Sequence, residues 1–321
     1  MRAGIRAKYS PPAATHALLH HWATARGFHR HAHTGDKSTT MQKQLSGVPE
    51  TMLWTLHNRA SEAARPDGCI RDEKCLEIYR SIDYDYMRRF GPPDGSHAVR
   101  AQLFDAHIRA FLAASPNGLI INLGEGLETQ RYRIDLPPDA LWVSIDLPGS
   151  IEVRERFIQP DTQHWHIAKS AFDTSWFDDV PAGRLAFISA QGLLMYFRES
   201  ELAELLHALA QRFPGSLLMF DYLNLALSQL SCSPWGWMVT SSYRTPPMPW
   251  GIDRAALQPT LSRWIGQPVE VHNVTYRHPR GPWQWLAPTL ENWAPHLANK
   301  LPGICWLQFP PCPITSPATA A

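Results

Sequence analysis

The feature of this sequence that most constrains its fold is a series of short apolar segments separated by segments of helical periodicity. The apolar segments are residues 119–123, 141–145, 164–168, 184–189 and 216–222. Amphipathic spacing typical of helices covers residues 51–63, 99–112, 150–157 and 202–209. Strands that are apolar throughout and alternate with helices indicate a mostly parallel sheet covered on both faces. We therefore expect an α/β fold.

The first of these strands ends in the turn Gly124-Glu125-Gly126. Glycines let the backbone approach a ligand closely, at the edge of the sheet where open α/β sheets bind ligands. Asp146 ends the next strand, 20 residues after Gly126. A carboxylate at this place can accept hydrogen bonds from both hydroxyls of a ribose. The pair predicts a nucleoside ligand, although a glycine pair after an apolar run can also be a simple tight turn.

The composition of the turn narrows the choice of nucleoside. A dinucleotide fingerprint requires a third glycine, and Thr129 stands there instead. Glu125 would repel a pyrophosphate, but it is compatible with a ligand that carries an amino group or a sulfonium. S-adenosylmethionine has both groups and no phosphate, so we predict it as the ligand.

Composition limits the other classes of protein to which the chain can belong. The chain has 321 residues, of which 44% are hydrophobic, and its net charge of +1 gives no footprint for nucleic acid or an anionic membrane. No apolar run reaches the length of a membrane-spanning helix, and the N-terminus lacks a secretory signal. The cysteines are odd in number and form no CxxC pair, which supports neither a disulfide framework nor a metal site. We expect a cytoplasmic protein.

Several segments together resemble the S-adenosylmethionine-dependent O-methyltransferases of the leucine carboxyl methyltransferase superfamily, in the branch of the tetracenomycin polyketide methyltransferase. They are "IINLGEGLETQRYRI", "WVSIDLPGSIEVRERF", "SAFDTSWFD" and "FISAQGLLMYFRESELAELLHALAQRFPGSLLMFD", and the resemblance runs from about Val48 to Asn224. It implies S-adenosyl-L-methionine as cofactor. It also implies a Rossmann-like class I methyltransferase fold with an N-terminal helical segment and a C-terminal cap.

The expected domain organisation follows from this resemblance and from local composition. Residues 1–45 are rich in histidine and read as a disordered arm, with a metal-binding tract as the alternative. Residues 46–308 form the methyltransferase domain, in which 98–225 hold the cofactor and 46–97 and 226–308 form a cap. Residues 309–321 are expected to be a loose tail. The final third is rich in tryptophan, which either lines an acceptor pocket or packs the cap onto the sheet.

The resemblance also implies roles for individual residues. Arg100 meets the carboxylate of the cofactor, Gly124 and Gly126 lie under its methionine portion, and Asp146 holds its ribose. The adenine borders on Ala171 and Phe172, although a phenylalanine here could equally belong to the core. The cofactor-binding set is completed by Glu125 and by Gln191, which stands where many members carry glutamate. Glu128 and Gln130 stand where the family often has aspartate and arginine.

Methyl transfer from a sulfonium is an in-line displacement, and a base is needed only when the nucleophile arrives protonated. Tyr196 and Asp221 lie near strand ends and are weak candidates for this base, and His97 precedes the cofactor helix. Tyr196 could instead be a packed aromatic and Asp221 a turn residue. Because a carboxylic acid is already ionised at neutral pH, the weakness of these candidates favours a carboxylate acceptor over a phenol.

These observations predict an S-adenosylmethionine-dependent O-methyltransferase that acts on a small carboxylate or phenol of specialised, polyketide-like metabolism. A protein carboxyl methyltransferase acting on a C-terminal leucine and a non-catalytic S-adenosylmethionine-binding regulator are the alternatives, and a nicotinamide oxidoreductase is a further one. We expect a small-molecule partner and no nucleic acid, membrane or metal. The sequence does not indicate the acceptor or the oligomeric state.

Overall fold

The structure is a computed structural model, and it describes residues 50–274, 276, 280, 284–286, 289 and 293–311. All of these residues fall within one compact unit, Met41–Ala321. The predicted arm at residues 1–45 and most of the predicted tail lie outside the described residues. Within the described part of the chain, none of the helices has the length and apolar character needed to cross a membrane.

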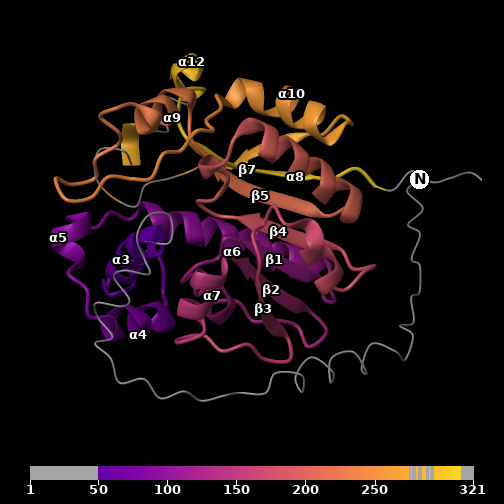
Figure 1. The fold of residues 1–321 in the computed structure, drawn as a ribbon, viewed down its shortest axis with the longest axis horizontal. Helices are drawn as coiled ribbons and strands as arrows, with labels where there is room; N and C mark the ends of the chain where they lie inside the picture. The colour runs from indigo at the N-terminus through magenta and orange to yellow at the C-terminus, as the bar shows by residue number, and fades with distance from the viewer. Residues whose placement is uncertain are drawn as a thin grey trace, which may run out of the picture. The chain divides into compact units, whose positions relative to one another are not determined.

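The described residues form a seven-stranded sheet in the order β3-β2-β1-β4-β5-β7-β6 (Figure 1). The first five strands in the chain run parallel, and β7 is antiparallel to both of its neighbours. The strands are β1 (Leu119–Leu123), β2 (Leu141–Asp146), β3 (His164–Ala168), β4 (Ala186–Ala190), β5 (Leu217–Tyr222), β6 (Val271–Val274) and β7 (Gly303–Gln308).

Helices cover both faces of this sheet and one of its ends. The described helices of at least one turn are α3 (Thr51–Ala63), α4 (Glu73–Ser81), α5 (Tyr86–Phe90), α6 (Ser96–Ala114), α7 (Pro148–Arg154), α8 (Glu199–Arg212), α9 (Leu225–Cys232), α10 (Arg254–Ile265) and α12 (Pro295–Ala298). In Figure 1, the indigo and violet helices α3, α4 and α5 lie together at the left of the sheet.

Two apolar layers explain why the strands carry no polar face. Side chains alternate across a strand, so Ile120 and Ile121 point to opposite sides of the sheet. Ile120 belongs to the layer that packs against Phe104 and Ile108 of α6. Ile121 belongs to the layer that packs against α8 and α10. Both isoleucines are fully buried, as expected for a parallel sheet that is covered on both faces.

The expected Rossmann-like class I methyltransferase fold is confirmed, and each predicted strand and helix is present with small shifts at its ends. The C-terminal third differs from the prediction in one respect. The sequence predicts a cap over residues 226–308, but within this range β6 and β7 extend the sheet beyond β5. The predicted start of the tail is also wrong, because Phe309 is buried and its N–H donates to the carbonyl oxygen of Ser216. The antiparallel pairing of β6 and β7 at the edge of the sheet joins residues that are far apart in the chain. It therefore leaves little signal in the local sequence.

A buried polar cluster lies beneath the turn that follows β1. The Arg154 guanidinium is fully buried and forms an ion pair with Glu125 at 3.2 Å. Its Nε donates to Nε2 of His166 at 3.3 Å, so the neutral His166 ring carries its proton on Nδ1 and faces Glu155. Burial and the nearby Arg154 lower the pKa of His166 to about 3, and the same causes lower the pKa of His164. These rings are neutral parts of the core at neutral pH.

This cluster predicts a fold that loses stability in mild acid. A histidine whose pKa is lowered by folding gives stability that is complete above pH 6.5 and declines as the pH falls toward 3, because the unfolded chain takes up the proton first. Between pH 6.5 and pH 5, His166 should cost up to about 2 kcal/mol of unfolding free energy. Urea unfolding at several pH values measures this loss of unfolding free energy.

The matched variants are His166→Asn and His207→Asn, the second of which alters an exposed histidine. The unfolding free energy of His166→Asn should depend less steeply on pH than that of the unaltered chain, whereas His207→Asn should keep the original slope. Equal slopes in all three proteins would contradict the assignment of a buried neutral His166.

Candidate functional site

A cavity of about 730 Å³ opens at the carboxyl ends of the central strands. Its floor is made by the segments that follow β1, β2, β4 and β5, and α3 and α6 contribute one wall. The opposite wall comes from the cap, through Leu227, Trp237 and Met248. A volume of this size is typical of small-molecule sites. The sheet edge that the sequence indicated therefore does border a ligand-sized space.

The glycine turn has the conformation that requires its residues. Gly124 has φ +64° and Gly126 has φ +52°, in the left-handed region that favours glycine. A Cβ on Gly124 would lie 2.7 Å from Cδ1 of Leu193, so a side chain there would also clash. Both glycines line the cavity with bare backbone. The turn thus brings the main chain to the cavity surface where a ligand can lie against it.

Arg154 holds this turn from below. Its Nη1 donates to the carbonyl oxygens of Gly126 and Glu128, at 2.8 Å each. The Glu125 carboxylate supplies the opposite charge, and it also accepts hydrogen bonds from Asn122 and Ser144. Burial raises the pKa of Glu125, while Arg154 acts in the opposite direction.

Glu125 lines the cavity, but its carboxylate is engaged on the far side of the turn. The sequence makes this acid compatible with a cationic ligand, and in the structure its carboxylate is the counter-ion of Arg154. Only 8% of Glu125 is exposed. A buried guanidinium needs an opposite charge close by, and this outweighs any contact with a ligand above the turn.

Asp146 is placed as a ribose-binding carboxylate would be. It accepts the N–H of Gly126 on Oδ2 at 2.8 Å and the N–H of Leu147 on Oδ1 at 2.7 Å. Burial raises its pKa, and the two backbone hydrogen bonds oppose that shift. The Ser150 side chain also donates to this carboxylate, and a carboxylate has about four acceptor sites, so it can still accept a hydroxyl donor. The contact to Gly126 ties the ends of β1 and β2 together at the floor of the cavity.

The other end of the cavity offers one unused donor and one unused acceptor. Arg100 forms an ion pair with Asp221 at 2.8 Å, and its Nε is buried without a hydrogen-bond partner in the described part of the chain. Oε1 of Gln191 is likewise buried and unpartnered there. A cation beside a carbonyl oxygen fits a ligand that carries both a carboxylate and an ammonium group, as the methionine portion of S-adenosylmethionine does.

The two predicted adenine neighbours behave differently. Ala171 lines the cavity. Phe172 is not among the lining residues, and its ring packs on Phe197 with the centroids 4.1 Å apart. The alternative reading of Phe172, a core residue, is the one that the structure supports.

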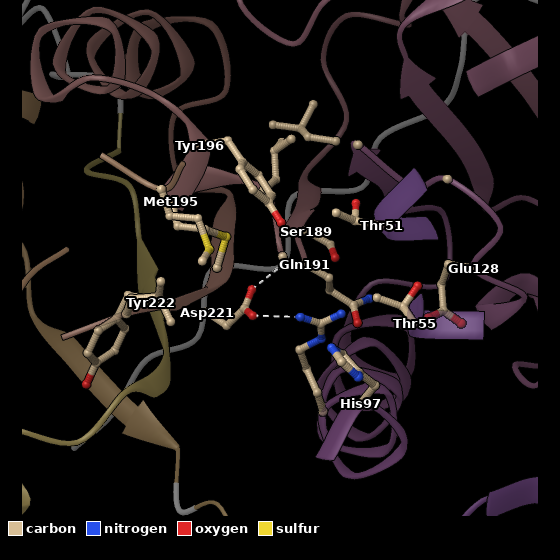
Figure 2. A pocket seen from close by; sticks show the side chains of 18 of the residues that line it. Thr51, Thr55, His97, Glu128, Ser189, Gln191, Met195, Tyr196, Asp221 and Tyr222 are labelled. Carbon is tan, nitrogen blue, oxygen red and sulfur yellow. Dashed lines mark hydrogen bonds and ion pairs between the residues drawn. The ribbon is translucent and has the colours of Figure 1, made fainter. Parts of the chain in front are cut away.

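Both weak candidates for a general base are already engaged, Asp221 by an ion pair with Arg100. Asp221 accepts the N–H of Gly192 on Oδ1 at 2.6 Å and the Arg100 guanidinium on Oδ2. Burial raises the pKa of Tyr196 to about 12, so its hydroxyl stays protonated at neutral pH. Figure 2 shows Tyr196, Asp221, Gln191 and His97 converging on one space, where they can orient a ligand.

His97 also lines this space, and its hydrogen bonds fix where its proton lies. The N–H of Asp94 donates to Oδ1 of Asn58 at 3.3 Å, so the amide nitrogen of Asn58 faces His97. That nitrogen donates to Nδ1 of His97 at 2.7 Å, which leaves the ring proton on Nε2. Burial and Arg100 lower the pKa of His97 to about 3. His97 is thus a neutral hydrogen-bond donor rather than a base.

Several lining residues were missed from the sequence. They come from α3 and the cap: Thr51, Trp54, Thr55, Leu227 and Met248. Of the tryptophans in the final third, Trp237 lines the cavity, Trp250 and Trp264 are buried in the core, and Trp235 is 84% exposed. Helical periodicity predicted α3 but could not show which of its faces borders the site. In the described part of the chain, no cluster of three or more metal-ligating side chains was found.

Comparison with known proteins places this site in a family. The model of the family "Leucine carboxyl methyltransferase" matches residues 53–210. The polyketide synthesis O-methyltransferase TcmP of Streptomyces glaucescens is 33% identical over 180 residues, which are 56% of this chain and 67% of TcmP. The chain belongs to the leucine carboxyl methyltransferase family. It is an S-adenosylmethionine-dependent methyltransferase.

Two more distant similarities are a second relative and a solved structure. The S-adenosyl-L-methionine-dependent methyltransferase dpfgK of Gibberella zeae is 26% identical over 189 residues, which are 54% of this chain and 63% of dpfgK. Matches therefore span about two thirds of these relatives' own length. Among solved structures, the N-methyltransferase NodS of Bradyrhizobium japonicum is 11% identical with a TM-score of 0.41, over 66% of this chain and 97% of NodS. A similarity this weak says nothing about the acceptor.

The position of Asp146 predicts its contribution to cofactor binding. Asp146→Ala should raise the Kd of S-adenosylmethionine more than about tenfold, because buried hydrogen bonds to the ribose would be lost. Isothermal titration calorimetry measures this, with Asp135→Ala, an exposed aspartate, as control. An unchanged Kd in an Asp146→Ala protein that unfolds at the original temperature would remove Asp146 from the site.

Proposed function

We propose that this chain transfers the methyl group of S-adenosylmethionine to an oxygen atom of a small organic molecule. The cofactor would lie over Gly124 and Gly126, with its ribose on Asp146 and its methionine end between Arg100 and Gln191. The proposal for the cofactor is supported by the family and by the unpartnered atoms of Arg100 and Gln191. The proposal for an oxygen acceptor is supported by the name of the relative TcmP.

The observation that carries the choice of a small acceptor is the apolar wall of the cavity. Beyond the glycine turn, the same cavity is lined by Met195, Leu223, Leu227, Trp237 and Met248. These side chains come from the segments after β4 and β5 and from the cap. Apolar walls with a few polar groups suit an aromatic or acyl molecule, such as a compound of specialised metabolism.

The hydrogen bonds at the site favour a carboxylate as the nucleophile. A phenol, with a pKa near 10, needs a base to remove its proton, whereas a carboxylic acid is ionised at neutral pH. Asp221 is occupied by Arg100 and Gly192, and His97 presents an N–H. Such a site can align an anion with the methyl group, and alignment by itself lowers the barrier by several kcal/mol.

Binding measurements test the cofactor. Calorimetry should show binding of S-adenosylmethionine and of its demethylated product, S-adenosylhomocysteine, and no binding of NAD. Tight binding of NAD without binding of S-adenosylmethionine would favour an oxidoreductase and overturn the proposal.

Transfer of a radiolabelled methyl group tests the acceptor. Small aromatic and acyl carboxylic acids should be labelled, and kcat/KM should vary little between pH 6 and pH 9, because the acceptor is ionised throughout. A rate that rises steeply with pH on phenols would instead indicate a phenol acceptor. Label on peptides that end in leucine would favour a protein carboxyl methyltransferase. If no compound were labelled, the result would favour a non-catalytic regulator.

A further inference from the structure

A chain of buried polar side chains runs from an ion pair outside the cavity to Gln191 at its wall. Arg133 donates to both oxygens of the Asp105 carboxylate, from Nε at 2.7 Å and from Nη2 at 3.0 Å. Asp105 also accepts a hydrogen bond from Nε2 of Gln130 at 2.8 Å. Gln130 is fully buried, and its Oε1 accepts a hydrogen bond from Nε2 of Gln191 at 3.4 Å.

The direction of every hydrogen bond in this chain is set by its first member. A carboxylate paired with a guanidinium only accepts, so the side of the Gln130 amide that faces Asp105 must be its nitrogen. The oxygen of Gln130 then faces Gln191. An oxygen requires a donor opposite it, so the nitrogen of the Gln191 amide must face Gln130. This reasoning holds whichever way either amide is drawn, because a flip at either place would bring like atoms together.

With its nitrogen facing Gln130, the Gln191 amide directs its oxygen away from Gln130. Oε1 of Gln191 is buried and has no hydrogen-bond partner in the described part of the chain, and Gln191 lines the cavity. An unpartnered buried carbonyl oxygen favours a ligand that brings a donor or a positive charge. The cavity wall at this place therefore has a fixed polarity that selects an ammonium group over a carboxylate.

We infer that Gln130, which does not line the cavity, is a positioning residue that orients the Gln191 amide toward the cofactor's α-ammonium group. This inference rests on the proposed function, because it takes S-adenosylmethionine as the ligand. Gln130 acts by removing the alternative orientation, in which the amide nitrogen of Gln191 would meet the ammonium. The ion pair of Arg133 and Asp105 anchors the chain from the side of α6.

The first test is Gln130→Met, which keeps the length of the side chain and removes both hydrogen-bonding atoms. The Kd of S-adenosylhomocysteine should rise about five- to tenfold, because the Gln191 amide is then free to turn. The Kd of adenosine, which has no amino group on its ribose 5′ side, should stay unchanged. Gln102→Met, an exposed glutamine on α6, is the matched control. Equal losses for both ligands, or no loss for either, would overturn the inference.

The second test restores the contact without Gln130. Both oxygens of a carboxylate accept, so a glutamate at position 191 needs no orienting partner. Gln130→Met combined with Gln191→Glu should recover the affinity for S-adenosylhomocysteine. In the chain that keeps Gln130, Gln191→Glu should raise the affinity for S-adenosylhomocysteine less than it does beside Gln130→Met, or should lower it. The reason is that the new carboxylate then faces the oxygen of Gln130. Additive effects of the two substitutions would contradict the inference.

The orientation itself can be observed without any ligand. Neutron diffraction from the deuterated free protein should place the amide deuterons of Gln191 toward Gln130. The opposite orientation would overturn the inference even if S-adenosylmethionine binds. If the unaltered chain binds no S-adenosylhomocysteine, the proposed function fails, and the neutron map still decides whether Gln130 orients Gln191.

Discussion

The site depends on one buried guanidinium, that of Arg154. It is fully enclosed, donates to the carbonyl oxygens of Gly126 and Glu128, and is neutralised by Glu125. A turn with two glycines in the left-handed region has considerable conformational freedom in the unfolded chain, so its backbone needs an anchor. Arg154 provides it from α7, behind the turn, and leaves the cavity side of the turn free for a ligand.

The same arrangement recurs around the cavity: the polar groups of its wall are held in place by other polar groups. Asp146 is fixed by two backbone N–H groups, Arg100 by Asp221, and His97 by Asn58. Buried polar groups of this kind are costly unless they are paired, and a paired group keeps its orientation. Preorganised groups lose little freedom when a ligand binds, which suits a reaction whose main requirement is alignment.

The resemblance to known methyltransferases and the geometry of the site contribute different information. The family gives the methyl donor class and the reaction type. The geometry gives the protonation states: His97 neutral with its proton on Nε2, Tyr196 with a pKa of about 12, and Asp221 engaged on both oxygens. These states bear on the acceptor, about which the family says less, because they distinguish a nucleophile that arrives ionised from one that needs a base.

The sequence by itself determined the parallel core of the sheet, since apolar runs and helical periodicity are local patterns that reflect burial on two faces. It also located Gly124, Gly126 and Asp146, because strand ends in such a sheet meet at one edge. Only the tertiary structure decided the partners of Glu125, Phe172 and Gln130, and the place of β6 and β7 in the sheet. A charged or amide side chain takes its role from its nearest partner, and here the partners are distant in sequence: Arg154 for Glu125, and Asp105 and Gln191 for Gln130.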